Sequence, residues 1–311
     1  MAKTTPRHRR SRPDSSGTKV STPTQRVRRQ QFRQWQKRLD NVWFYFLVLV
    51  IFIYLMFPFY WAFVSALKTE GELARTPATL IPSNPTWRNF TAVLQNPTFT
   101  RSLLNSFIVA TTTTLLSLIV GSLASFALGK LRFRAKRVTL YIILAMTMFP
   151  AIAILSGLFA VIRTLNLAAM PSMIFSYMIF TLPFAVWIMT SFFRAIPDSL
   201  LQAARVDGAN LLQTLWYVLL PLSAPALVTT GLLSFINAWN EYLFALTFTS
   251  IEPAARTVPV AIAFFTGEVA RQEPFGEIMA AGLLASIPLI LLVLFFQHRI
   301  VEGVTAGAVK G

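Results

Sequence analysis

Residues 199–222 read SLLQAARVDGANLLQTLWYVLLPL and lie between two long apolar segments. The first half of the stretch combines alanines, a glycine and an aspartate, whereas its neighbours carry almost no charge. Pro197, just before it, suits the first turn of a helix, and Asp198 complements the positive end of the helix dipole. The stretch therefore predicts a short, water-compatible helical insert between two apolar segments.

Two capping signals divide this insert into a pair of helices. Gly208 follows residues 200–206 at a position where glycine commonly ends a helix in the left-handed conformation. Asn210 and Gln213 have the spacing of a capping box, which would start a second helix. Small side chains gather on one side, at Ala203, Ala204, Gly208 and Ala209. Because a solvated loop needs no pair of capped helices, the insert is typical of a docking element that another protein approaches closely.

The rest of the chain has the composition of a membrane protein. Of 311 residues, 55% are hydrophobic and 13% are charged, and the mean hydropathy is +0.58, whereas soluble domains carry roughly a quarter charged residues. Six uncharged stretches are long enough to span the hydrocarbon core, which takes about 20 helical residues. They are Val42–Leu67, Ser102–Gly129, Val138–Ile162, Thr164–Phe193, Leu222–Asn240 with a continuation past Glu241, and Ile278–Gln297. We expect an all-α membrane protein with six transmembrane helices and both termini on one side.

Basic residues indicate which side faces the cytoplasm. Residues 1–41 and 129–137 are rich in Lys and Arg, whereas the segments on the opposite side are sparser in both. The positive-inside rule therefore predicts cytoplasmic termini, an external segment at 68–101 and an external loop at 251–277. Residues 1–41 have too few apolar side chains to fold alone and predict a disordered basic tail that anchors the topology.

Several kinds of site have no sequence signal. The chain has no cysteine, and its two histidines, His8 and His298, lie in the basic tail and just past the last apolar run. It has no P-loop motif G-x-x-x-x-G-K-[ST], no H-E-x-x-H and no G-x-S-x-G. We therefore expect no catalytic residue, no metal site and no cofactor on this chain.

The second predicted span has a face of small residues. Its members are four positions apart: Thr113, Ser117, Gly121, Ser125 and Gly129. Small residues at this spacing let two helix backbones approach closely in lipid. The pattern favours a helix–helix interface and leaves the partner helix unidentified.

The fifth predicted span has a polar face. Thr230, Ser234, Asn237 and Glu241 are separated by four, three and four positions, and Asn240 is adjacent. A polar stripe in lipid should face protein or water, so Ser234, Asn237, Asn240 and Glu241 are candidates for lining a transport path. An equally weighted hypothesis makes Glu241 an interfacial residue that caps the end of the span.

Three prolines lie within predicted spans, namely Pro58, Pro150 and Pro183. Each removes a backbone hydrogen bond and is expected to bend or break its helix. Such bends often line cavities in transporters, and they are also ordinary in membrane helices.

The insert resembles the cytoplasmic signature of permease subunits of ATP-binding-cassette importers. In that family the motif begins Glu-Ala-Ala, continues with Asp-Gly-Ala and later has Leu-Pro. The matching residues here are Ala203, Ala204, Asp207, Gly208, Ala209, Leu220 and Pro221. Gln202 replaces the usual glutamate, so a hydrogen bond is possible at this position and an ion pair is not.

Further stretches are similar to the maltose-type branch of sugar permeases, over nearly everything from about residue 42 to the end. They are FPFYWAFVSALKT at 57–69, LLNSFIVA at 103–110, FINAWNEYLFAL at 235–246 and GVTAGAVKG at 303–311. The resemblance implies a type I importer permease fold. It implies that Ser199–Pro221 dock into a cleft on the ATPase subunit and that Ile251–Glu277 reach a solute-binding protein. It also implies that Val304–Gly311 reach the ATPase pair, with Thr305, Ala306, Gly307 and Lys310 as candidate contacts.

By this resemblance the chain is a non-enzymatic subunit that moves a sugar, such as maltose or trehalose, across the cell membrane of a prokaryote. The implied partners are a second, different permease, two ATP-binding subunits that hold ATP and Mg, and an extracellular or periplasmic solute-binding protein. No nucleic-acid partner is expected. The alternatives are the same machine for a polyol or glycerol phosphate, or a stand-alone proton-coupled carrier. The carrier is weakly motivated, because only Glu241 interrupts a span.

Overall fold

The structure is a computed structural model that describes residues 23–265 and 274–308, with side chains described for 41–265 and 274–298. It divides into two compact units, Met1–Pro58 and Phe59–Gly311, which we describe separately. The described residues are helical or irregular and contain no β-strand, so the predicted all-α class is confirmed.

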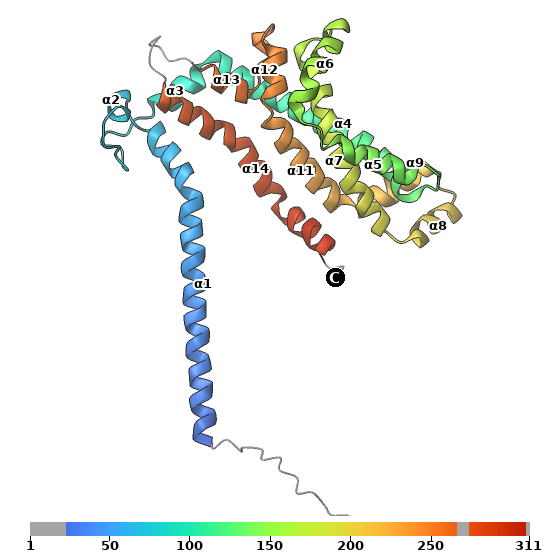
Figure 1. The fold of residues 1–311 in the computed structure, drawn as a ribbon, viewed down its shortest axis with the longest axis horizontal. Coiled ribbons are helices and arrows are strands. Elements are labelled where there is room, and N and C mark those ends of the chain that lie inside the picture. Colours follow the sequence, from blue (N-terminus) through green and yellow to red (C-terminus); the bar gives the residue numbers. More distant parts are fainter. Residues whose placement is uncertain (1–22, 266–273, 309–311) are drawn as a thin grey trace, which may run out of the picture. The chain divides into compact units, whose positions relative to one another are not determined.

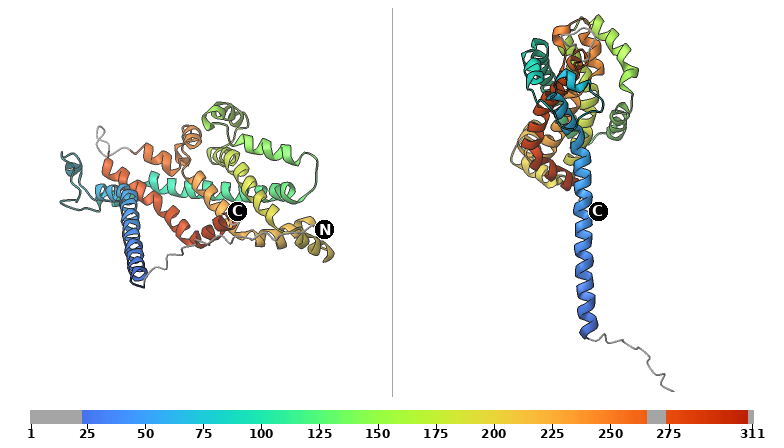
Figure 2. Two further views of the ribbon diagram at one scale, coloured as in Figure 1. Left: turned by 60° about the horizontal axis from the view of Figure 1, so that its bottom comes forward. Right: turned by 90° about the vertical axis from the view of Figure 1, so that its left-hand side faces the viewer.

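The first unit consists, within its described residues, of most of helix α1 (Pro23–Ala66), which Figure 2 shows as one long helix. Side chains from residue 42 to residue 57 are exposed. The helix begins inside the segment 1–41 that the sequence predicts to be disordered. Residues 23–40 are rich in Gln and Arg, which are good helix formers; residues 1–22 lie outside the described part.

The second unit holds the remaining helices, drawn in Figure 1. They are α2 (Glu70–Leu73), α3 (Arg88–Gln95), α4 (Pro97–Lys130), α5 (Lys136–Met146), α6 (Ala151–Thr164), α7 (Ala169–Ala195), α8 (Asp198–Val206), α9 (Leu211–Gln213), α10 (Leu220–Leu222), α11 (Ala224–Trp239), α12 (Leu243–Thr249), α13 (Val258–Ala263) and α14 (Phe275–Ala308). A π-helical turn joins α9 to α10 at Thr214–Leu219, and a 3₁₀ turn occupies Pro253–Ala255.

Four helices of the described chain are long and apolar enough to cross a membrane: Asn41–Ala66, Pro97–Lys130, Ala169–Ala195 and Phe275–His298. Two bent pairs raise this number to six if each pair forms one span. In one pair α5 and α6 meet at 96°, and in the other the segment Leu211–Leu222 meets α11 at 82°. Five of the six predicted stretches thus lie mainly within one helix each, and the break between α5 and α6 divides the sixth, Val138–Ile162.

The prolines behave differently from one another. Pro150 precedes the first residue of α6 at the 96° bend, as expected for a helix breaker. Pro58 and Pro183 instead lie inside α1 and α7, which continue through them. Pro183 is buried, so packing around α7 offsets the backbone hydrogen bond that it removes.

The small-residue face of α4 packs against α7, and the two helices lie side by side (Figure 1). A Cβ atom added to Gly121 would lie 3.1 Å from the Cβ of Ala185, and one added to Gly129 would lie 3.1 Å from the Cβ of Phe193. Both separations are tight for carbon atoms, so the two backbones approach as closely as the glycines allow. The predicted interface is confirmed, and its partner is α7.

Hydroxyl groups add hydrogen bonds to this seam. The hydroxyls of Ser117 and Thr181 are 2.7 Å apart and share a hydrogen bond. Ser125 donates to the backbone carbonyl of Val186 at 3.0 Å. Such bonds between apolar helices are each worth about 0.6–2 kcal/mol in a membrane. The α4–α7 pair is thus held by close packing and by polar contacts.

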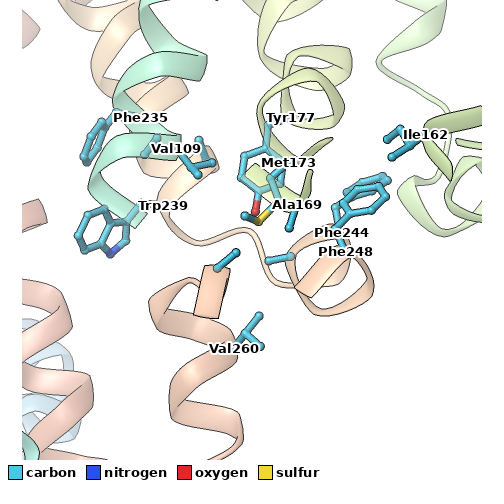
Figure 3. Packing of buried hydrophobic residues seen from close by; sticks show 14 residues of the cluster. Val109, Ile162, Ala169, Met173, Tyr177, Phe235, Trp239, Phe244, Phe248 and Val260 are labelled. Atoms are coloured by element: carbon cyan, nitrogen blue, oxygen red, sulfur yellow. The ribbon is translucent and has the colours of Figure 1, made fainter. Parts of the chain in front are cut away.

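The largest apolar cluster of the described residues joins parts of several helices around α7. Figure 3 shows its members, among them Tyr177 and Met173 of α7, Trp239 of α11 and Phe244 of α12. Phe244 and Phe248 stack along α12, with ring centroids 6.3 Å apart. This cluster fixes the place where α11 ends and α12 begins.

Candidate functional site

The insert folds as its capping signals predict. Gly208 has φ +81°, the left-handed conformation, directly after α8. The N–H of Gly208 donates to the carbonyl of Arg205 at 3.1 Å, and the N–H of Ala209 donates to the carbonyl of Ala204 at 2.9 Å. This pair of bonds is the Schellman motif, which satisfies the last carbonyls of α8. The predicted turn at Gly208 is confirmed.

The second half of the insert starts with the predicted capping box. The N–H of Gln213 donates to the side-chain oxygen of Asn210 at 2.9 Å, and the N–H of Asn210 donates to that of Gln213 at 2.8 Å. The chain then forms the π-helical turn, which the sequence did not predict. Pro221 follows it and has no N–H to offer the carbonyl of Tyr217, so a regular α-helix could not close there.

Apolar side chains fix the insert to the ends of α4 and α7. Leu201 of α8 and Leu215 and Leu219 of the π-helical turn are buried with Phe126 and Phe193. Burying a leucine side chain stabilises by about 1.5–3 kcal/mol. The insert is therefore a fixed part of the second unit.

The residues of the signature divide between the surface and this apolar cluster. Those exposed are Gln202, Ala203, Asp207, Gly208 and Pro221. Ala209 and Leu220 are half-buried, and Ala204 is buried beside the cluster. Apolar side chains extend this exposed face, because Val206 is 88% exposed and Tyr217 is 79% exposed. The structure thus gathers most of the predicted docking residues on one accessible insert and turns Ala204 inward.

The residues of the predicted polar stripe on the fifth span differ in how deeply they are buried. Thr230 and Ser234 are fully buried in the packing around α11. Asn237, Asn240 and Glu241 line a pocket of about 470 Å³. Tyr177, Phe180, Thr181 and Tyr242 are among the other lining residues of this pocket. Three of the four predicted path residues therefore meet at one pocket, and Ser234 lies inside the protein.

Glu241 lies in a break between two helices. The sequence predicts a span that continues past this residue; that prediction is wrong, because α11 ends at Trp239 and α12 begins at Leu243. The carboxylate oxygens of Glu241 accept from the N–H groups of Phe244 at 2.9 Å and Ala245 at 3.0 Å. A negatively charged acceptor satisfies the free N–H groups at the start of a helix. Glu241 thus caps the helix that follows it and also lines the pocket.

Two polar residues of α4 hold the loop that follows α12, and the spacing patterns did not single them out. The amide of Asn105 donates to the carbonyls of Ala254 and Arg256, both at 2.9 Å. The hydroxyl of Ser106 accepts from the N–H of Val258 at 2.8 Å. Both residues belong to the stretch LLNSFIVA, where a polar pair within an apolar span was an available signal.

The same loop is also attached to α7. A carboxylate oxygen of Glu252 accepts from the N–H of Ala169, the first residue of α7, at 3.1 Å. A carboxylate at this position complements the helix dipole. The N-terminal parts of α4 and α7 are therefore both bonded to residues 252–258.

A family model for the inner membrane component of binding-protein-dependent transport systems matches residues 114–305. The match runs from the middle of α4 through the insert at 199–222 and into α14. The chain belongs to this family. It is a permease, a multi-pass protein of the cell membrane.

Curated relatives match the permease over most of its length. It is 40% identical over 259 residues to the trehalose transport system permease protein SugB of Mycobacterium tuberculosis, covering 83% of this chain and 93% of that protein. It is also 40% identical over 259 residues to the trehalose/maltose transport system permease protein MalG of Thermococcus litoralis, covering 82% and 92%.

A solved structure confirms the fold of the permease. The chain superposes, with a TM-score of 0.73 at 23% sequence identity, on a chain of a bacterial ABC transporter involved in the import of the acidic polysaccharide alginate. The superposition covers 85% of the permease and 98% of that chain. The type I importer permease fold that the sequence implies is thus confirmed.

The remaining predicted contacts of the permease fall partly outside the described residues. Thr305, Ala306 and Gly307 lie in the helical backbone of α14, and their side chains are outside the described part. Lys310 and the stretch 266–273 of the predicted external loop are likewise outside it. The ATPase and binding-protein contacts assigned to these residues stay predictions.

Proposed function

We propose that this permease is the translocation subunit of an ATP-driven importer that moves an oligosaccharide, such as maltose or trehalose, into the cell. The observation that supports this best is the docking insert. Its two capped helices expose Gln202, Ala203, Asp207 and Gly208 and are fixed by buried leucines to α4 and α7. A rigid exposed element of this kind suits a partner that pushes on the membrane helices.

The sugar is supported by the names of the relatives and by the chemistry of the pocket. Relatives at 40% identity are named for trehalose and for trehalose and maltose. Asn237 and Asn240 offer amide groups to sugar hydroxyls, and Tyr177 and Phe180 offer aromatic faces to a sugar ring. A polyol or a glycerol phosphate carried by the same machine is the alternative.

The proposed transporter contains further chains. A second, different permease completes the path, and two ATP-binding subunits hold ATP and Mg against the docking inserts. A solute-binding protein delivers the sugar on the outer side. In this arrangement the permease itself binds no cofactor and hydrolyses nothing.

The test is reconstitution of the whole complex. The permease is co-expressed with the products of its neighbouring transport genes, and the purified complex is placed in liposomes with ATP inside. Uptake of labelled trehalose and maltose is measured with and without the binding protein, and a complex with an inactive ATP-binding subunit is the control. ATP-dependent uptake is expected; uptake of neither sugar, with hydrolysis intact, would contradict the choice of substrate.

A second measurement separates the importer from a proton-coupled carrier. The permease is purified alone, reconstituted and supplied with a proton gradient and no ATP. We expect no uptake from this preparation. Gradient-driven uptake by the isolated chain would contradict the ATP-driven mechanism.

A further inference from the structure

One lysine joins three helix ends at the base of the docking insert. Lys130 is the last residue of α4, and its side chain is only 5% exposed. Its ammonium group donates to the carbonyl of Ile196 at 2.5 Å and to a carboxylate oxygen of Asp198 at 2.7 Å. Ile196 directly follows the last residue of α7 as its C-cap, and Asp198 is the first residue of α8.

These contacts suit a buried cation. The carbonyl at the end of α7 lacks a partner within its own helix, and the negative end of the helix dipole attracts a positive charge. The hydrogen bond and the charge of Lys130 hold the pKa of Asp198 below its ordinary value, so this carboxyl is ionised at neutral pH. A nearly buried ammonium group is costly unless it is paired, and the present arrangement of α4, α7 and α8 supplies the partners.

The backbone alone connects α7 to α8 weakly. Only Ile196 and Pro197 separate the two helices, and both have extended ψ angles. Lys130 adds a link from α4 across this junction, beside the buried contact of Leu201. A force applied to α8 thereby reaches α4 and α7 together.

We propose that Lys130 is a positioning residue that makes the docking insert move as one body with the α4–α7 pair. Its role is to pass the movement of the ATP-binding subunits to the membrane helices. The proposal rests on the proposed function for its partners. The contacts of Lys130 with Ile196 and Asp198, which we call the three-helix joint, lie within this chain. They can be tested without any substrate.

Lys136 provides a matched control. Its ammonium group donates to the carbonyls of Gly129 at 2.9 Å and Leu131 at 3.4 Å, at the end of the same helix α4. These bonds do not cross to α7 or α8. A substitution of Lys136 therefore removes a comparable cation and leaves the three-helix joint in place.

The first experiment measures sugar taken up per ATP hydrolysed by the reconstituted complex. Lys130→Met is expected to lower this ratio by about fivefold or more, the lower end of typical coupling between two sites. Lys130→Arg should retain most of the ratio, because a guanidinium can donate to both acceptors, and Lys136→Met should keep the wild-type ratio. An unchanged ratio in Lys130→Met, with normal assembly, would overturn the proposal.

A second variant covers the case in which Lys130→Met does not assemble. The side chain of Asp198 is 72% exposed, so Asp198→Ala removes the α8 half of the joint with little effect on packing. It should lower the ratio in the same direction. A wild-type ratio in an assembled Asp198→Ala complex would also overturn the proposal.

The second experiment measures directly whether α8 is held in place relative to α7. The chain has no cysteine, so Ser191→Cys on α7 and Val206→Cys on α8 place two spin labels at exposed positions. Lys130→Met should broaden the distribution of distances between the labels, and Lys136→Met should not. An unbroadened distribution in Lys130→Met would refute the joint, even if the transported substrate proved not to be a sugar.

Discussion

Replacing Gly208 separates the two properties that the proposed docking role requires there, a left-handed turn and room for a partner. The residue has φ +81°, is exposed, and a Cβ atom added to it would meet nothing within 4 Å. Gly208→Val brings both strain and bulk to this position. Gly208→Asn brings bulk with little strain, because asparagine tolerates the left-handed conformation.

The structure sets the expected magnitudes. A side chain other than glycine or asparagine costs about 1–2 kcal/mol in the left-handed conformation. The Cβ atom of Gly208→Val would meet nothing within 4 Å, so this strain is the main stability loss expected, small beside a typical 5–15 kcal/mol. If an ATPase subunit lies close to Gly208, inserted atoms cost about 1–3 kcal/mol more at that contact. The latter range corresponds to an affinity about 5- to 150-fold weaker.

The assay measures ATPase-subunit affinity, ATP hydrolysis and uptake in liposomes for both variants. Both should insert in the membrane and bind the ATPase subunits more weakly, and Gly208→Val should also hydrolyse ATP without matching uptake. Normal affinity and uptake in both would refute the docking role of the insert. Normal behaviour of Gly208→Asn alone would show that the turn matters and that close approach does not.

Three further changes test other parts of the permease. Glu241→Ala removes a cap worth about 1 kcal/mol and a pocket carboxylate, so uptake should slow without loss of complex assembly; unchanged uptake kinetics would favour a purely interfacial role. Deleting residues 1–30 keeps Arg33, Lys37 and Arg38 beside the first span, so accessibility of a cysteine at Ser250 and uptake per complex should match those of the wild type. Hydrogen bonds, chiefly from the N–H of Ser83, hold the pKa of Glu72 below its ordinary 4.5. A depressed pKa means that the stabilisation is present above pH 4.5 and is lost as the pH falls through the lower folded value. Proteolysis of segment 68–86 should therefore accelerate only in acid, and in Glu72→Gln already at pH 7; equal cleavage of both proteins at pH 7 would contradict this.

The local fold of the insert was predictable because its signals are local. The Schellman turn at Gly208 and the capping box of Asn210 and Gln213 each depend on residues within one or two helical turns. The small-residue face of α4 predicted an interface without naming α7, because one face does not encode the other. A signal existed in α7, where Thr181 and Ala185 are small and four positions apart.

The break after α11 was not predictable from apolar content alone. The stretch 235–246 reads as one apolar helix with polar residues in it, and those residues were assigned to its face. The structure shows that α11 has already ended at Trp239 and that Glu241 caps the following helix, α12, through its bonds to Phe244 and Ala245. Prolines were equally ambiguous: Pro183 is buried within α7, whereas Pro58 lies within α1 without such packing. The position of a proline in a sequence does not by itself distinguish a bend from a continuous helix.

The contacts at the two ends of the α4–α7 pair bear on which elements can move during transport. Near one end of the pair Asn105 holds residues 254–256, and at the other end Lys130 holds the start of α8. Between them, glycines and hydroxyls keep the two backbones too close to separate without losing packing and hydrogen bonds. If this pair moves as one body, a change in the size of the pocket must come from elements whose helices are interrupted. The non-helical residues 240–242, which line the pocket through Asn240 and Glu241, are such an interruption.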